Sequence, residues 1–135
     1  MNLLRLSHLV QNAAWDSEID RTLAAFGGRI EQMGRAVPMM AAALSTRLAG
    51  VQQIVLAGSD QDRSSFARIV ARHYLPFAIT INLGDRAADR VEALLPLVAA
   101  MRPQDGKSAA YVCRDFTCEA PVNDPAALEK LLSAV

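Results

Sequence analysis

The 135 residues are 52% hydrophobic but only 5% aromatic, which predicts one domain, or a domain plus an accessory layer, with an aliphatic core. The 14 basic and 14 acidic side chains cancel and are scattered, so we expect no nucleic-acid partner and no membrane partner. No signal peptide is recognisable, and the longest apolar runs are too short to cross a membrane. With two cysteines and no secretory signal, we expect a cytoplasmic location and reduced thiols.

Residues 1–49 carry the spacing of three amphipathic helices. The first covers the apolar run at residues 3–10. The second is expected to be capped by Asp16 or Ser17 and to end at Gly34. The third begins at Pro38, which suits a first helical turn, and ends at Gly50. Short connections between such helices predict part of an antiparallel helical layer.

Two glycines, Gly27 and Gly28, lie inside the second helix, where each costs about 1 kcal/mol relative to alanine. We therefore expect another helix to approach closely at this point. We expect the exposed side of the three helices to leave an apolar patch, because such a helical layer needs partners outside this chain. This predicts a homodimer, or association with another protein subunit, through the N-terminal helices.

From residue 50 onward, strand and helix patterns alternate. Strands are expected at residues 53–57 and 77–83, followed by a hairpin with strands at 109–114 and 117–121. A helix follows each of the first two strands. The first can be capped by Ser59, Asp60 or Asp62, with His73 or Tyr74 on its inward face.

The second of these helices follows Gly84 and Asp85, and Pro96 must kink it or begin a second short helix. The pair Asp124-Pro125 predicts the start of a final helix with Val135 on its inward face. The order strand, helix, strand, helix, strand, strand, helix predicts an α/β fold with a mixed four-stranded sheet and helices on its faces.

That order is the thioredoxin-like one, although other α/β folds share such strings of elements. We therefore expect two parts, a helical segment at 1–49 and a thioredoxin-like domain at 50–135. A thioredoxin oxidoreductase keeps its reactive cysteine at the start of the helix after the first strand, where the helix dipole lowers the thiol pKa. In this chain that place is residues 58–62, with the sequence G-S-D-Q-D and no cysteine.

The only two cysteines, Cys113 and Cys118, have four residues between them, which is neither the redox spacing nor a zinc-binding spacing. On a hairpin that turns at residues 114–117, they lie roughly opposite each other, close enough for the sulfurs to meet. They are either a redox-responsive pair or two small, half-buried hydrophobic residues. The remaining candidate hairpin surface consists of Tyr111, Arg114, Asp115 and Phe116.

No metal or cofactor is expected. His8 and His73 are far apart in the sequence, and neither belongs to a metal-binding motif. Ser59 and Asp60 lie where a helix start could bind an anion, but two acids and no glycine-rich loop favour a capping role. No combination of residues typical of hydrolytic catalysis is present.

Residues 101–122 resemble the C-terminal end of the spermatogenesis-associated, thioredoxin-domain-containing protein family. Their sequence is M-R-P-Q-D-G-K-S-A-A-Y-V-C-R-D-F-T-C-E-A-P-V. The segment N-L-L-R-L at residues 2–6 and the helix through Phe26 and Gly28 look like the last helices of that family's α/α toroid. The resemblance implies a longer protein, with a thioredoxin-like domain and a six-hairpin, glycosidase-like toroid ahead of this region. Where family members tend to have proline, this sequence has Ser108, which weakens a redox-site interpretation.

Three functions follow from these observations. The first is a non-catalytic C-terminal module of a family protein, with a structural or partner-binding role. The second is a thiol redox enzyme or sensor that uses Cys113 and Cys118. The third is residual carbohydrate binding inherited from the toroid, which is poorly supported because Trp15 is the only tryptophan.

Overall fold

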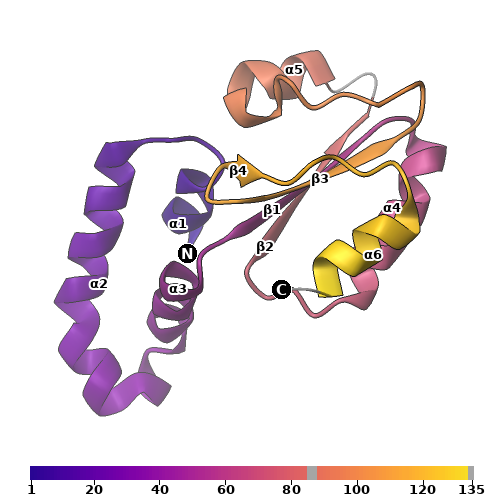
Figure 1. Ribbon diagram of the computed structural model, residues 1–135. Helices are drawn as coiled ribbons and strands as arrows, with labels where there is room; N and C mark the ends of the chain where they lie inside the picture. Colours follow the sequence, from indigo (N-terminus) through magenta and orange to yellow (C-terminus); the bar gives the residue numbers. More distant parts are fainter. Residues whose placement is uncertain (85–87, 134–135) are drawn as a thin grey trace. The chain divides into compact units, whose positions relative to one another are not determined.

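The computed structural model describes residues 1–84 and 88–133. Asp85, expected to lead into a helix, and Val135, expected on an inward helix face, lie outside the described residues. The chain folds into two compact units, Met1–Val51 and Gln52–Val135. The first contains helices only, and the second contains the sheet and its helices (Figure 1).

The helical unit consists of α1 (Asn2–Ser7), α2 (Ala13–Met33), the short helix η1 (Gly34–Ala36) and α3 (Pro38–Ala49). Helix α2 begins earlier than expected, because the Asn12 side chain accepts hydrogen bonds from the backbone nitrogens of Ala14 and Trp15 at 3.0 and 3.4 Å. Asn12 is therefore the cap, and the assignment of this role to Asp16 or Ser17 was wrong. Asparagine is among the strongest N-cap residues, and its amide oxygen satisfies helix amides that would otherwise lack a partner.

The helical unit has a small core of aliphatic side chains. Leu4 of α1, Ile19 and Leu23 of α2 and Ala43 of α3 are buried together, with Met40 and Leu44 packed against them. Helix α3 is also tied to α2 by Arg47, whose guanidinium donates two hydrogen bonds to the Asp20 carboxylate, at 2.9 and 3.0 Å. This two-bond geometry is the specific form of an arginine–carboxylate pair.

The glycine pair in α2 does not have the close neighbour that was expected. Apart from the adjacent residues and the backbone of α2 itself, no described atom lies within 4 Å of the position where a Cβ atom would stand on Gly27 or on Gly28. The helical cost of these two glycines is therefore not offset by a close contact with any described residue of this chain.

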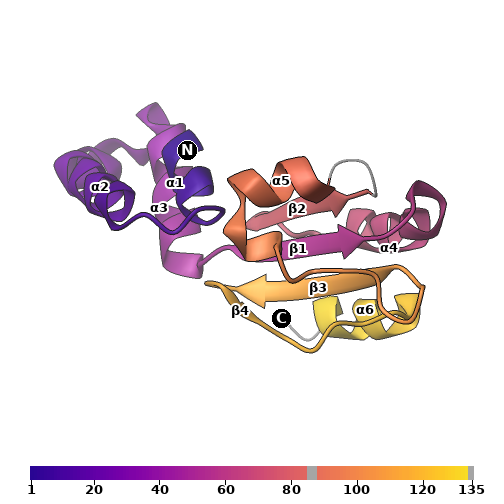
Figure 2. The ribbon, with the colours of Figure 1, turned by 90° about the horizontal axis from the view of Figure 1, so that it is seen from above.

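The α/β unit contains one four-stranded sheet in the order β2-β1-β3-β4 (Figure 2). The strands are β1 (Gln52–Ala57), β2 (Ala78–Leu83), β3 (Ala109–Arg114) and β4 (Thr117–Cys118). β1 pairs in parallel with β2 and antiparallel with β3, and β3 pairs antiparallel with β4. This mixed α/β architecture confirms the expected fold class and is consistent with a thioredoxin-like fold.

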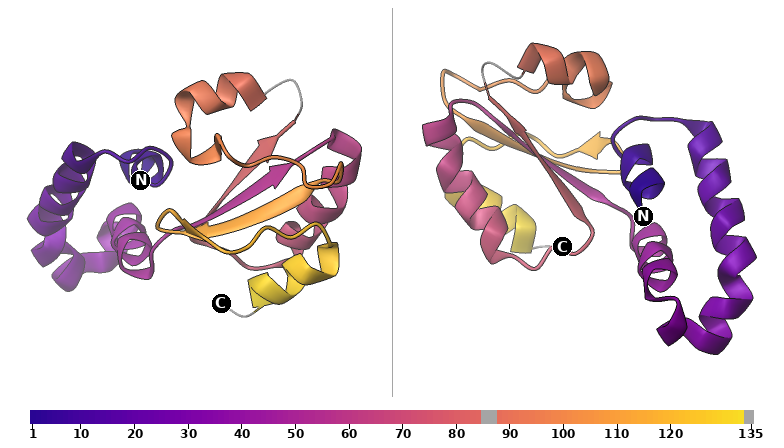
Figure 3. Two further views of the ribbon diagram at one scale, coloured as in Figure 1. Left: turned by 45° about the horizontal axis from the view of Figure 1, so that its top comes forward. Right: turned by 180° about the vertical axis from the view of Figure 1, so that it is seen from behind.

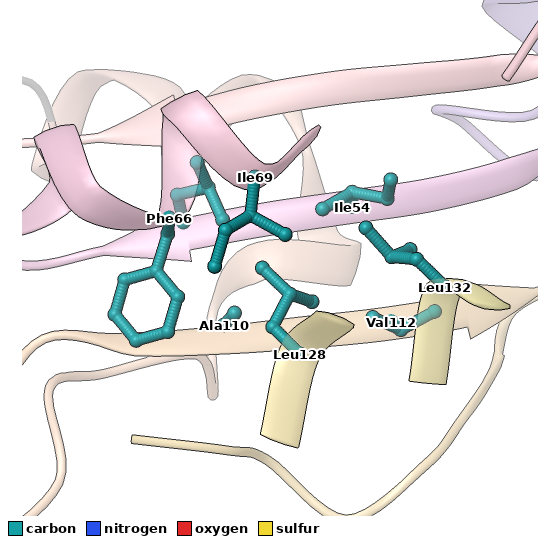
Figure 4. Packing of buried hydrophobic residues seen from close by; sticks show 8 residues of the cluster. Ile54, Phe66, Ile69, Ala110, Val112, Leu128 and Leu132 are labelled. Atoms are coloured by element: carbon teal, nitrogen blue, oxygen red, sulfur yellow. The ribbon is translucent and has the colours of Figure 1, made fainter. Parts of the chain in front are cut away.

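Helices cover both faces of the sheet (Figure 3). On one face, α4 (Asp60–Arg72) and α6 (Pro125–Ser133) pack against β1 and β3 and form one core (Figure 4). The helices contribute Phe66, Ile69, Leu128 and Leu132, and the strands contribute Ile54, Leu56, Ala110 and Val112. On the other face, α5 (Ala88–Leu94) and the short helix η2 (Pro96–Val98) cover a second core. Its buried members are Val55, Ala57, Leu83, Val98, Met101, Ala109, Tyr111 and Cys113.

Several local expectations can be compared with these elements. Ser59 caps α4, where its hydroxyl accepts a hydrogen bond from the Asp62 backbone nitrogen at 3.3 Å, and Pro96 begins the second short helix. Tyr74 does not lie on an inward face. It is 91% exposed, because α4 ends at Arg72 and His73 already has an extended backbone. β4 is also shorter than expected and ends at Cys118.

Candidate functional site

The hairpin between β3 and β4 turns through Asp115 and Phe116, which have φ angles of 47° and 65°. A two-residue hairpin turn with both central residues at positive φ twists in the sense that suits the flanking strands, and normally uses asparagine, aspartate or glycine. A bulky residue such as phenylalanine is an outlier at positive φ. Asp115 therefore suits this turn, whereas Phe116 is held in a conformation that its side chain disfavours.

Cys113 of β3 and Cys118 of β4 are register partners, one residue pair further from the turn than Arg114 and Thr117. Their Cα–Cα distance is 3.9 Å. The two sulfurs form a disulfide bond. The expected opposition of the cysteines across the hairpin is confirmed, but the expected reduced state is not what the structure contains. Cross-strand neighbours on one face of an antiparallel pair bring their Cβ atoms close together, and this proximity is what permits the bond.

The two sulfur-bearing residues differ in burial. Cys113 is 1% exposed and belongs to the core that α5 and η2 cover, whereas Cys118 is exposed on the outermost strand. One half of the disulfide is thus anchored in the fold, and the other half faces solvent.

Of the four residues expected on the hairpin surface, Arg114 and Asp115 are exposed and Phe116 is half-buried. Tyr111 is not a surface residue. It is 8% exposed, its hydroxyl donates a hydrogen bond to the Arg102 carbonyl at 2.7 Å, and it accepts one from the Arg102 backbone nitrogen at 3.1 Å. The strand alternation turns Tyr111 to the same core as Cys113, so its role is to hold the segment before β3.

The start of α4 is the place where a thioredoxin enzyme would carry its reactive cysteine. Here it is occupied by a polar cluster around buried Arg63, whose Nε donates a hydrogen bond to the Gly58 carbonyl at 2.8 Å. The Arg63 Nη2 also pairs with the Asp60 carboxylate. These bonds hold the first turn of α4 against the end of β1, so the cluster stabilises the fold.

Gly58, directly after β1, has a φ of 132° and packs against Ser108, directly before β3. Ser108 is buried, and its hydroxyl has no hydrogen-bond partner among the described residues. A nearby groove of about 620 Å³ is lined by polar residues that include Asp62, Arg68 and Lys107. The charged side chains of this groove are one acid and two bases.

Arg63 and the Gly58–Ser108 contact were not predicted as features of this site. A glycine directly after a buried strand was the available signal for the contact, because it marks a close approach or a positive φ. Nothing in the local sequence distinguishes Arg63 from an ordinary surface arginine.

Metal binding has no structural support in the described part of the chain, where no three His, Cys, Asp or Glu residues are grouped so as to hold an ion. His8 and His73 belong to different units. His73 lies at the end of α4, where its Nδ1 is 3.0 Å from the Ile69 carbonyl oxygen. Within residues 1–84 and 88–133, no helix is both long enough and apolar enough to cross a membrane.

The exposed apolar side chains are concentrated on the helical unit. Met33 at the end of α2 and Met39 and Leu48 on α3 are 58%, 62% and 78% exposed. Leu3 and Leu6 of α1 are exposed as well. The buried cluster of this unit has only four hydrophobic residues, so several of its large apolar side chains stay outside the core.

The chain is similar over 133 residues to spermatogenesis-associated protein 20 from human, with 31% identity, from rat, with 29%, and from mouse, with 28%. Each alignment covers 97% of this chain but only 17% of the relative's length. The resemblance that the hairpin region suggested is thus confirmed, and the coverage is consistent with a C-terminal region of a larger protein. No protein-family model and no solved structure matches the chain.

Proposed function

Because this chain is homologous to a region of the spermatogenesis-associated proteins, we propose that it is a non-catalytic module of the C-terminal end of such a protein, and that it binds a protein partner. The observation that carries this proposal is the exposure of Met33, Met39 and Leu48 on the helical unit. Large apolar side chains left on one small unit are typical of surfaces that associate with another protein.

The partner that we propose is a second copy of this chain, bound through α1, α2 and α3, with a different protein subunit as the alternative. Burial of the exposed methionine and leucine side chains would contribute roughly 25 cal/mol for each Å² of apolar surface removed from water. The proposal includes a cytoplasmic setting and involves neither nucleic acid nor a membrane, in keeping with the balanced charge.

A non-catalytic role is also supported by the start of α4. The segment at residues 58–62 has no cysteine, and its polar groups are engaged in capping the helix and in holding Arg63. Residual carbohydrate binding is less well supported, because Trp15 is half-buried at the start of α2 and is the only tryptophan available as a stacking platform.

Light scattering after size-exclusion chromatography, over a range of micromolar concentrations, tests the proposal. The wild-type chain should dimerise, and the double variant Met39→Glu, Leu48→Glu should be monomeric because it places a charge at two exposed apolar positions of α3. The matched control, Tyr74→Glu, changes a side chain that is even more exposed but lies in the other unit, and it should dimerise as the wild type does.

A wild-type chain that stays monomeric at every concentration contradicts the homodimer. The alternative subunit is then tested by photo-crosslinking in cells, with the reactive group placed at position 48 or at position 74. Binding through the helices predicts one protein product from position 48 and none from position 74. If neither position gives a product, the partner-binding role itself is wrong.

A further inference from the structure

We propose that the Cys113–Cys118 disulfide is a thiol-exchange site, at which a low-molecular-weight thiol of the glutathione class modifies Cys118 and so controls the conformation of the hairpin tip. This inference concerns the α/β unit and does not depend on partner binding by the helical unit. It rests on two observations, the unequal burial of the two cysteines and the positive φ angles of Asp115 and Phe116.

Burial decides which sulfur reacts. A thiolate must reach the sulfur that it attacks, and exchange rates depend on that access. Cys118 is exposed on a strand of only two residues at the edge of the sheet, whereas Cys113 is 1% exposed inside the core. An incoming thiolate therefore reaches the Cys118 sulfur, and the Cys113 sulfur is the leaving group.

The chemistry balances with the thiol as the only co-reactant. The thiolate forms a new sulfur–sulfur bond with Cys118 Sγ, the bond between the two cysteines breaks, and its electron pair stays on Cys113 Sγ, which takes up the proton lost by the incoming thiol. A second thiol attacks the small-molecule sulfur of the mixed disulfide and releases Cys118 as a thiol. Two small thiols are oxidised to their disulfide while the protein disulfide is reduced, and the reverse reaction restores it.

The turn supplies the conformational response. Asp115 and Phe116 are both at positive φ, one residue pair beyond Cys113–Cys118, so the covalent bond secures a turn that the Phe116 side chain disfavours. β4 contains only two residues, and the backbone hydrogen bonds that continue the pairing join Val112 to Glu119 and Ala110 to Val122, on the side of the disulfide away from the turn. Opening the disulfide therefore frees residues 114–118 to leave the left-handed turn.

Site-directed variants test which sulfur is modified. Each variant, Cys113→Ser or Cys118→Ser, keeps one thiol and is incubated with oxidised glutathione in native buffer. The product is then measured by intact mass and peptide mapping. We expect nearly complete adduct formation on Cys118 in Cys113→Ser, and at least tenfold slower formation on Cys113 in Cys118→Ser. Equal rates in the two variants, or a faster reaction at Cys113, would overturn the assignment.

The wild-type chain provides a test that does not depend on the variants folding. Its disulfide is reduced by glutathione in increasing, subdenaturing concentrations of urea. Exchange in the native state predicts a rate that is nearly independent of urea. A rate that rises steeply with urea would show that the bond opens only on unfolding, and the switch would be wrong.

Amide hydrogen exchange of the same protein measures the response of the tip. The reduced form should exchange the amides of residues 114–118 at least tenfold faster than the oxidised form, while Val55 and Leu56 of β1 keep their protection. Unchanged exchange at the tip would contradict control of its conformation, even if Cys118 is modified.

Discussion

The position that a Cβ atom would occupy on Gly58 overlaps the Ser108 hydroxyl and lies 2.9 Å from Ser108 Cα. The end of β1 therefore approaches the start of β3 more closely than any other residue type would allow at position 58. Gly58 also has a φ of 132°, which side chains other than hydrogen rarely adopt.

Replacement of this glycine should be strongly destabilising. We expect Gly58→Ala to lower the free energy of unfolding by about 3 kcal/mol or more, because backbone strain and steric overlap act together. Gly106→Ala is the control, since Gly106 also has a positive φ but nothing within 4 Å of its Cβ position among the described residues. Urea unfolding should show a clearly smaller loss for Gly106→Ala, and equal losses would argue against the overlap at Ser108.

The buried Tyr111 hydroxyl should contribute measurably to stability. Tyr111→Phe removes the bonds to the Arg102 carbonyl and nitrogen while keeping the aromatic ring in the core, so we expect a loss of about 1–2 kcal/mol. Tyr74→Phe removes the hydroxyl of an exposed tyrosine and should change the free energy of unfolding very little. If both variants are as stable as the wild type in thermal and urea unfolding, the Tyr111 anchor is not significant.

The disulfide should stabilise the fold only modestly, because it closes a short loop. A cross-link of this loop length is expected to contribute about 2 kcal/mol, mainly by restricting the unfolded chain. Cys118→Ser should therefore unfold at a lower urea concentration than the oxidised wild type. Addition of a reductant should lower the wild type to the same midpoint and leave Cys118→Ser unchanged. A variant as stable as the oxidised wild type would contradict this account.

Helix α2 offers a stabilising change. Gly28→Ala should raise the free energy of unfolding by up to about 1 kcal/mol, because the helix interior favours alanine and the added methyl group meets open space. If a partner helix packs on this glycine, the same substitution should weaken association while it stabilises the monomer. Thermal unfolding and light scattering on one sample separate the two effects. A lower melting temperature would contradict the open environment of Gly28.

The class of fold could be predicted from local patterns, because each pattern depends on near neighbours in the sequence. A short apolar run rich in β-branched residues marked β1, alternating apolar residues marked β2, and Pro38, Ser59 and Asp124 marked helix starts. Asn12 was missed because Asp16 and Ser17 lie nearby and are equally good caps in isolation. Only the observed hydrogen bonds to Ala14 and Trp15 distinguish among them.

The sequence by itself determined the helical first third, the α/β remainder, the absence of a cysteine at the start of α4 and the opposition of Cys113 and Cys118 across a hairpin. Tertiary structure alone decided which cysteine is buried, that Tyr111 faces the core, that Arg63 is buried and that Gly58 meets Ser108. The reason is physical. Periodicity and turn chemistry act over a few residues, whereas burial and close contact depend on segments that meet only when the sheet assembles and its faces are covered.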